Sequence, residues 1–473
     1  MNVVVRTKTF TSGLAALFAA VLVVAPAEAV EVTVTGHGAV PDGKTPATAA
    51  IQAAIEACQP GDTVVFPRGR FVSGSVRLRS GITLRLDEGA VWLASRDPAD
   101  YLGQGVPALV RGDRVTGVTI EGHGSIDGQA EHEWREEGKQ GDDFIRAETE
   151  NARRAGVEMK RAHGLPPRPS LLVLRDSRDL RLTGITVRRS PFWSVHFANC
   201  EDVVVERVRI ESSLESGVNA DGLDIDGCRR VRVRGCTIAT GDDAVCLKST
   251  RGEAGGAACE DVTVEDCVLT STSCALKIGT ETYGDFRRIV FRDCEIRDSN
   301  RGLGIFVRDG ATVSDVTFSR IRIECNRKHY PWWGDGDPLR FVVLKRKPDS
   351  KIGRIEKVRV EDVTARGQGT SLIAGLGPET VSGVSLVRTR LTMEAEGKPD
   401  KRATDGLIVR DAAQVSLEDV DIRWDTARGT EPKWRSGLRV ERADDLRLEQ
   451  VRIDAAPGAG APAVTGAVEA DRR

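Results

Sequence analysis

The chain has 473 residues, a formal net charge of −2 at neutral pH, 40% hydrophobic residues and 29% charged residues. Its 68 basic residues are balanced by 70 acidic ones, so a nucleic acid is not an expected partner. The length would allow two or three compact domains, but an elongated repeat protein of this size can form one domain.

Residues 1–29 have the features of a cleavable export signal. Arg6 and Lys8 precede an apolar run over residues 13–24, and the Ala-Glu-Ala sequence at 27–29 fits a signal peptidase site. The run is shorter than the roughly 20 residues that a membrane-spanning helix needs. We therefore expect this segment to be removed, and the mature protein to be secreted or periplasmic with no membrane span.

The next part of the chain predicts a short helix and then strands. Apolar residues at helical spacing between residues 49 and 58 indicate an amphipathic helix, and short β-type runs separated by glycine follow up to residue 121. A helix at this place would cap the first coil of a repeat, where apolar core and strand edges would otherwise be exposed.

Residues 129–169 interrupt this pattern. They are highly charged, favour a helix at first and become proline-rich at their end. We interpret them as an insertion that projects from one turn. Two interpretations stay open, a wall of a substrate cleft or a solvated excursion.

From residue 180 onward a repeat dominates the sequence. Its pattern, apolar-x-apolar-x-x-apolar-x-apolar, alternates with period two as strands do and returns about every 27 residues as the coils of a solenoid do. A leucine-rich repeat has a similar period, but its Leu/Asn consensus is absent. The repeat predicts an all-β fold, a single-stranded parallel β-helix over residues 30–455, in which the first position of each pattern forms a buried inward ladder. These positions are Leu180, Val203, Val231, Val262, Ile289, Val316, Val358, Val384, Val415 and Leu446.

Six of the ten cysteines also follow the repeat. Neighbouring rungs lie ~4.8 Å apart, which a disulfide can span, but an inward position suits a buried thiol that acts as a small hydrophobic residue. We therefore expect mainly buried thiols, and the spacings do not predict a zinc site. The two ladders are Cys236, Cys267, Cys294 and Cys200, Cys228, Cys259.

The segment 217–248 contains two copies of a short acidic pattern. Asp221 and Asp243 each stand two residues before an apolar strand residue and are separated by about 22 residues, or one coil, so they should stack on neighbouring rungs with Asp242 beside them. Gly-Asp-Asp is also an ordinary turn sequence. However, stacked like charges are unfavourable unless they have partners or share a proton, which favours a functional role. Three clustered carboxylates can supply the acid and the base of glycosidic hydrolysis.

These motifs carry a family resemblance. Asn219-Ala-Asp-Gly and Gly241-Asp-Asp resemble the NTD and GDD motifs of glycoside hydrolase family 28, the polygalacturonase-like pectin hydrolases, and the resemblance extends from about residue 34 to about residue 453. It implies a right-handed β-helix, in agreement with the handedness of parallel crossovers. It also implies inverting hydrolysis of pectic polysaccharide without a cofactor.

The resemblance further implies a role for each site residue. Asp242 would be the general acid, Asp221 and Asp243 would hold the hydrolytic water, and Asn219 would bind or orient nearby. Two more acids, Asp224 and Asp226, crowd the site, but their spacing is not that of an EF-hand loop, so we predict no metal.

The chain departs from the family where the family grips the galacturonate carboxylate. The family's Gly-His-Gly falls on Ser273-Cys274-Ala275, and its Arg-Ile-Lys falls on Gly304-Ile305-Phe306. Candidate replacement cations are Lys277, Arg301 and Arg308. Lys277 should point outward toward the cleft, so Lys277→Ala should raise KM or lower kcat/KM and change stability by no more than about 0.5 kcal/mol, as for a surface change. The alternative is an ordinary exposed lysine on a strand. The departures point away from plain polygalacturonate, toward rhamnogalacturonan or another decorated pectin.

Two later segments lack the repeat. Residues 325–340 bring together Tyr330, Trp332 and Trp333, which would either stack on sugar rings or pack back on the coil. Residues 456–473 are small and proline-rich, and we expect them to be a disordered tail.

The favoured function is a secreted, monomeric glycoside hydrolase that acts on pectic polysaccharide. Its expected substrate-binding residues are Asn219, Lys277, Arg301, Trp332 and Trp333. Two alternatives remain. The missing His, Arg and Lys would fit a β-helix that binds polysaccharide without cleaving it. A β-helical pectate lyase would instead use bound calcium and a basic residue.

Overall fold

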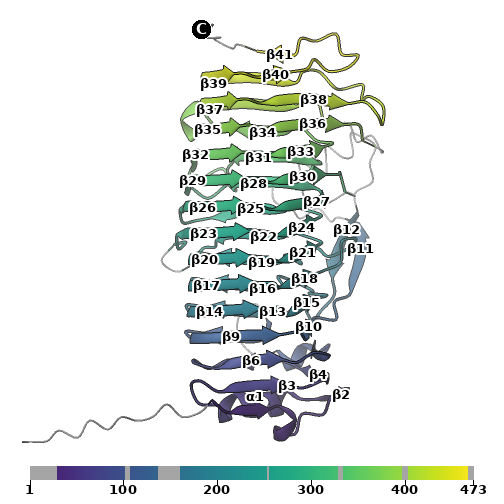
Figure 1. The fold of residues 1–473 in the computed structure, drawn as a ribbon, viewed down its shortest axis with the longest axis vertical. Helices are drawn as coiled ribbons and strands as arrows, with labels where there is room; N and C mark the ends of the chain where they lie inside the picture. The colour runs from purple at the N-terminus through teal and green to yellow at the C-terminus, as the bar shows by residue number, and fades with distance from the viewer. Residues whose placement is uncertain are drawn as a thin grey trace, which may run out of the picture.

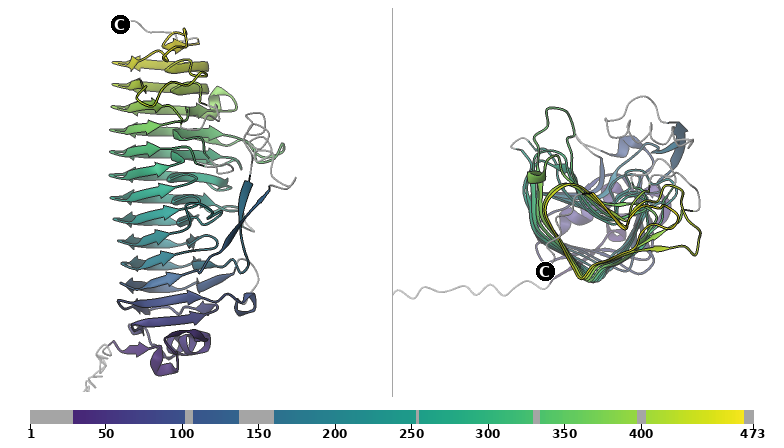
Figure 2. Two further views of the ribbon diagram at one scale, coloured as in Figure 1. Left: turned by 90° about the vertical axis from the view of Figure 1, so that its right-hand side faces the viewer. Right: turned by 90° about the horizontal axis from the view of Figure 1, so that it is seen from above.

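The computed structural model describes residues 29–101, 107–136, 160–252, 255–328, 334–396 and 403–466. They form an elongated right-handed parallel β-helix, in which the strands of successive coils stack one above another (Figure 1) and superpose when seen along the axis (Figure 2). The predicted fold class is confirmed. The predicted export segment up to residue 28 and the aromatic residues Tyr330, Trp332 and Trp333 lie outside the described residues.

Each regular coil contributes one strand to each of three faces. In one coil, β19 (Leu223–Asp226) lies on face 1, β20 (Arg229–Arg234) on face 2 and β21 (Thr237–Thr240) on face 3, and β22 (Val245–Ser249) then returns to face 1 and pairs in parallel with β19. Face 1 also contains β5 (Val76–Arg77), β8 (Ala108–Asp113), β13 (Ser170–Arg175), β16 (Val195–Ala198), β25 (Leu276–Thr282), β28 (Arg301–Val307), β31 (Asp337–Val343) and β34 (Ser371–Ala374).

Faces 2 and 3 repeat in the same way. Face 2 contains β1 (Glu31–Thr33), β3 (Thr63–Phe66), β6 (Thr83–Leu86), β9 (Thr116–Gly122), β14 (Arg178–Thr183), β17 (Glu201–Glu206), β23 (Cys259–Glu265), β26 (Phe286–Arg292), β29 (Thr312–Ser319), β32 (Arg354–Glu361) and β35 (Val381–Val387). The long strands β37 (Leu407–Glu418) and β39 (Leu438–Glu449) join faces 1 and 2. Face 3 contains β2 (Asp42–Pro46), β4 (Gly69–Ser73), β7 (Ala90–Ala94), β10 (Ser125–Asp127), β15 (Thr186–Arg188), β18 (Arg209–Glu211), β24 (Val268–Ser271), β27 (Glu295–Ser299), β30 (Arg322–Cys325), β33 (Thr364–Gly367), β36 (Arg390–Glu394), β38 (Asp421–Asp425) and β40 (Arg452–Ile453).

The predicted inward ladder runs along face 2. Val203, Val231, Val262, Ile289 and Val316 are partners in successive strand pairs, and each is at most 2% exposed. Because the strand period is two, this register turns the alternating residues outward, where charged side chains form ion pairs between coils. The predicted register is confirmed.

All ten cysteines are free and buried, and the six of the two predicted ladders lie in the main core, as expected for inward positions. Burial raises the pKa of the Cys228 and Cys259 thiols, so they stay protonated. The thiols therefore contribute apolar volume to the core.

The first coil is capped by α1 (Thr48–Ala57), which buries Ile51, Ala54 and Ile55 in the main core (Figure 1). The predicted capping helix is confirmed. Short 3₁₀ turns occur at η1 (Thr35–His37), η2 (Pro98–Asp100) and η3 (Pro378–Thr380).

The described ends of the charged insertion form an antiparallel hairpin, β11 (His132–Glu136) with β12 (Lys160–Gly164), on the side of the helix (Figure 2). Ala162 of this hairpin packs on Val218, and Arg168 Nη2 lies 3.3 Å from Asn219 Oδ1. The base of the insertion therefore contacts the turn that leads into β19.

The predicted disordered tail is partly wrong. Within the described residues up to 466, β41 (Val464–Thr465) pairs with β39, and Ala456 packs on Trp434. The edge of the last coil offers free backbone groups and an apolar surface, which this segment covers. Among the described residues, no helix has the length and apolar character needed to cross a bilayer.

Candidate active site

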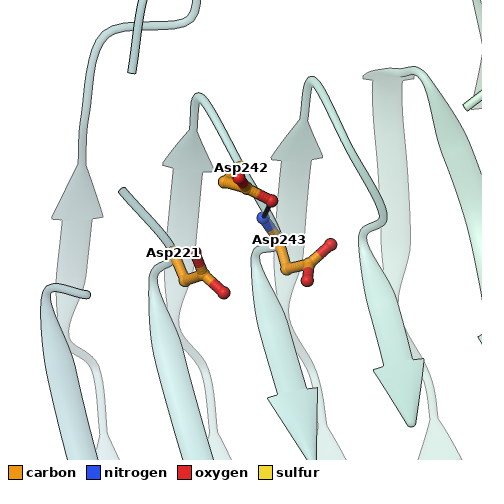
Figure 3. Close-up of side chains that lie close together, drawn as sticks. All are labelled: Asp221, Asp242 and Asp243. Atoms are coloured by element: carbon orange, nitrogen blue, oxygen red, sulfur yellow. Dashed lines mark hydrogen bonds between the residues drawn. The ribbon is translucent and has the colours of Figure 1, made fainter. Parts of the chain in front are cut away.

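The three aspartates lie where the chain passes from face 3 to face 1 on two neighbouring coils (Figure 3). Asp221 precedes β19, and Asp242 and Asp243 precede β22. One oxygen of each carboxylate lies within 4.8 Å of the others. The structure therefore brings together the three acids that the repeat register placed on adjacent rungs.

Local backbone geometry fixes Asp242. Its carboxylate accepts hydrogen bonds from Asn219 N at 3.0 Å and from Asp243 N at 2.9 Å. Asn219 has a φ of 56°, a left-handed conformation in which asparagine is enriched. Gly241 lies so close to the preceding turn that a Cβ would fall 2.1 Å from Ser213 O. These two motif residues therefore build the turns that hold Asp242.

Asp243 is held as an anion. Its Oδ1 accepts hydrogen bonds from Ser273 Oγ at 2.8 Å and Cys274 N at 3.2 Å, and its Oδ2 accepts one from Lys277 Nζ at 2.5 Å. Burial alone would raise the pKa of Asp243, but the Lys277 and Lys248 ammonium groups hold it below its usual value. Asp243 is therefore ionised under conditions in which its neighbours hold protons.

The pKa values of the other two acids, Asp242 and Asp221, are shifted in the opposite direction. Burial, and next the charge of Asp243, raise the pKa of Asp242 to about 6. Burial and the nearby Asp224 raise the pKa of Asp221 above its usual value, although Lys248 Nζ lies 3.3 Å from Asp221 Oδ2 and opposes the shift. Groups whose environments push their pKa values apart are suited to separate acid and base roles.

Lys277 is not the exposed strand lysine that was predicted as one possibility. Its side chain is only 12% exposed, and its ammonium group is paired with Asp243. Lys248 is 4% exposed and lies over the Trp193 ring at 4.7 Å. Both lysines do point outward from the coil, but the walls of a pocket cover them, so the expected stability change of about 0.5 kcal/mol on removing Lys277 is too small.

These groups lie in a pocket of about 240 Å³ on face 1. The predicted residues Asn219, Lys277, Arg301 and Arg308 all line it. Arg301 Nε donates to Asp337 Oδ2 at 2.7 Å, and its guanidinium lies 4.9 Å from the Phe306 ring centre. The other predicted binding residues, Trp332 and Trp333, lie outside the described residues.

Five further pocket residues were not identified from the sequence: Trp193, Thr280, Glu281, Leu344 and Arg346. Glu281 lies on β25 beyond Lys277, where the pairing of β22 with β25 shifts register, so the alternation of side chains does not identify it. Leu344 and Arg346 follow β31 in a loop, and no periodic pattern marks a loop residue as part of a site.

Three acids this close could also ligate a cation. A divalent ion at this position would, however, meet the ammonium groups of Lys277 and Lys248, which already compensate the charge of Asp243 and Asp221. The donor set therefore suits a proton and substrate hydroxyls better than a metal.

Comparison with known proteins agrees with this geometry. The family model described as "Glycosyl hydrolases family 28" matches residues 62–373, and a second model, "Rhamnogalacturonase A/epimerase, pectate lyase-like", matches residues 32–87. The chain is 28% identical to a Vitis vinifera protein named "Probable polygalacturonase", over 76% of this chain and 74% of that protein. It is 24% identical to an "Endo-polygalacturonase" of Pectobacterium parmentieri, over 74% and 85% of the two chains.

A solved structure shares the fold. The family 28 exopolygalacturonase of Yersinia enterocolitica matches with a TM-score of 0.65 and 20% identity, over 91% of this chain and 79% of that one. The family model covers well over half of the chain and includes all three aspartates. The chain thus belongs to glycosyl hydrolase family 28 and is a glycosidase.

Proposed function

We propose that the protein hydrolyses glycosidic bonds of pectic polysaccharide with Asp242 as general acid and Asp243 as general base. The observation that carries this proposal is the difference between the two acids. Asp243 is ionised by its contact with Lys277, whereas burial and the Asp243 charge raise the pKa of Asp242 to about 6. The named activities of the polygalacturonase relatives support the substrate class.

The reaction follows from these protonation states. Asp242 donates its proton to the glycosidic oxygen as the bond to the anomeric carbon breaks. Water attacks that carbon and gives a proton to Asp243, while Asp221 holds the water by a hydrogen bond. Asp242 ends as a carboxylate and Asp243 as an acid, and exchange with solvent restores both.

We propose inversion at the anomeric carbon, and this rests on the family resemblance. The nearest carboxylate oxygens are within 4.8 Å of one another. As a general rule, carboxyl groups roughly 5 Å apart accompany retention and those about 6.5–9.5 Å apart accompany inversion, so the separation by itself favours retention and the resemblance alone supports inversion. The anomeric configuration of the first product, followed by proton NMR, distinguishes the two mechanisms.

Assays on a panel of pectic polysaccharides test the function. We expect new reducing ends to be released without an unsaturated, ultraviolet-absorbing product. Equal release of absorbance and reducing ends would indicate a lyase. Binding without release of reducing ends would indicate a polysaccharide-binding protein.

We also propose that residues 30–455 act as one catalytic domain, and that the protein is exported and works as a monomer. The apolar run over residues 13–24 supports export. Mass spectrometry of the N-terminus and light scattering of the mature protein test these two points.

A further inference from the structure

Glu281 adds a fourth acid to the pocket that the catalytic aspartates line. It belongs to β25, and its side chain lines the pocket with 29% exposure. Its Oε2 lies 3.6 Å from Lys248 Nζ, and its Oε1 lies 3.5 Å from Arg346 Nη2. The Glu281 carboxylate therefore occupies a place between two cations, as the carboxylate of a substrate would.

The cations around Glu281 are already engaged with protein acids. Lys248 also contacts Asp221 and Asp224 at 3.3 and 3.4 Å. Arg346 donates to Asp309 through Nε at 2.8 Å and through Nη2 at 2.9 Å. A carboxylate arriving with the substrate would have to compete with these partners.

Two further cations of the pocket are also paired with protein carboxylates. Lys277 is paired with Asp243 at 2.5 Å, and Arg301 with Asp337 at 2.7 Å. Lys277 and Arg301, like Lys248 and Arg346, are therefore paired with protein acids before any substrate binds.

The neighbouring wall is apolar. Phe306 and Leu344 line the pocket, and Phe306 packs with Val342 and Ala374 beneath them. Phe306 stands where the family resemblance places the Lys that grips a galacturonate carboxylate. This surface suits a methyl group better than a charged one.

The electrostatics disfavour a free uronate beside Glu281. Burial alone would raise the pKa of Glu281, but Lys248, Lys277 and Arg346 lower it to about 2, so the group is an anion at any working pH. A second carboxylate would be repelled in a partly desolvated pocket. A sugar hydroxyl, in contrast, can donate to Glu281 and accept from Arg346.

We propose that Glu281 is a specificity-determining residue, which admits at its subsite a glycosyl unit without a free carboxylate and disfavours a free uronate. The unit has an apolar substituent at its C6 end, which packs on Phe306 and Leu344. Both a 6-deoxy sugar and a methyl-esterified uronate meet this requirement. The inference rests on the proposed function, because it concerns the substrate of the same site.

The test compares kcat/KM of the wild-type enzyme and of Glu281→Gln on three substrates: polygalacturonate, highly methyl-esterified polygalacturonate, and a rhamnogalacturonan backbone with a 6-deoxy sugar in alternate positions. The wild type should prefer the second or the third substrate, and the preferred one identifies the unit. Glu281→Gln should raise kcat/KM on polygalacturonate about tenfold, because it removes the repulsion and releases Lys248 and Arg346.

Glu361→Gln is a matched control. Glu361 lies on β32 of face 2 with 22% exposure and contacts two arginines, Arg359 at 2.6 Å and Arg388 at 3.8 Å. The Glu361→Gln variant loses the same charge as Glu281→Gln, but at a place outside the pocket. The substrate preference of this variant should therefore equal that of the wild type. Glu281→Asp keeps the charge and should keep the preference.

A wild type that prefers polygalacturonate, or a Glu281→Gln variant with unchanged preference, overturns the proposal. Calorimetric titration with galacturonate oligosaccharides separates this result from a failure of the proposed function. If the wild type cleaves none of the three substrates, tighter binding by Glu281→Gln still supports the role of Glu281, and equal binding overturns it.

Discussion

Two lysines make three neighbouring aspartates chemically different. Lys277 contacts Asp243 at 2.5 Å, and Lys248 lies between Asp221 and Asp224. Without these cations, burial would raise the pKa of every carboxyl group in the cluster. The lysines therefore decide which acid is the base.

The pKa values predict how activity depends on pH. Asp242 must be protonated to donate, so kcat/KM should fall as the pH rises through about 6, the value to which its pKa is raised. Asp243 must be ionised, and because its pKa is lowered, the acidic limb should lie below its ordinary value of 3.8. A profile that stays flat from pH 5 to pH 8 would contradict the assignment of Asp242.

Lys277→Met should move the acidic limb to higher pH. Without the Lys277 ammonium group, burial is opposed mainly by Lys248 and by the Ser273 hydrogen bond, so the pKa of Asp243 should rise and the base should become protonated at a higher pH. Breaking a buried ion pair should also lower the free energy of unfolding by about 3 kcal/mol. The measurements are pH–rate profiles and urea unfolding.

Lys357→Met is the control for this variant. Lys357 lies on β32 with a side chain that is 73% exposed, so its removal should change stability by less than about 0.5 kcal/mol. If the two variants unfold alike and Lys277→Met keeps the wild-type acidic limb, Lys277 does not set the pKa of Asp243.

At the scale of strands, much of the site was predictable because register is periodic. The apolar ladder through Val231 and Val262 fixes which residues turn inward on face 2. The common offset of Asp221 and Asp243 before Leu223 and Val245, which pair on face 1, places the two acids on adjacent rungs. The alternation of side chains along a strand also predicts that Lys277 points outward. This alternation could not show that Lys277 is buried, because the covering residues come from other coils and loops.

The pocket residues that the sequence did not identify lie where the strand repeat is interrupted. The pairing of β22 with β25 shifts register between Leu247 and Ser249, just where β25 approaches Glu281, so parity counting is uncertain there. Arg346 lies in a loop after β31, where no repeat constrains the sequence. Loop residues of this kind are found only from the structure.

The cysteine ladders give a test at this scale. Because all ten thiols are free and buried, none should react with a thiol reagent in the native protein, and all ten should react after denaturation without a reducing agent. Fewer reactive thiols in the denatured, unreduced protein than in a reduced sample would reveal a disulfide and contradict the structure.

In the whole molecule, the solenoid brings distant chain segments to one place. The pocket combines Asp221 before β19, Asp243 before β22, Lys277 on β25, Arg301 on β28 and Arg346 after β31. Each coil adds one functional position on or beside face 1, before, within or after its strand, and the continuous core beneath holds the stacked coils in register. A polymeric substrate can therefore lie along the stack of coils and contact several of them.

The most direct test of the catalytic account is the turnover number of Asp242→Asn on the best pectic substrate. The amide keeps the shape of the side chain but cannot donate a carboxylic proton, so kcat should fall about 10²–10⁴-fold in a protein that remains folded by circular dichroism. The alkaline limb of its pH profile should also flatten, because the group that titrates there is gone. Near-normal turnover of Asp242→Asn would contradict the account, since a residue other than Asp242 would then be the acid.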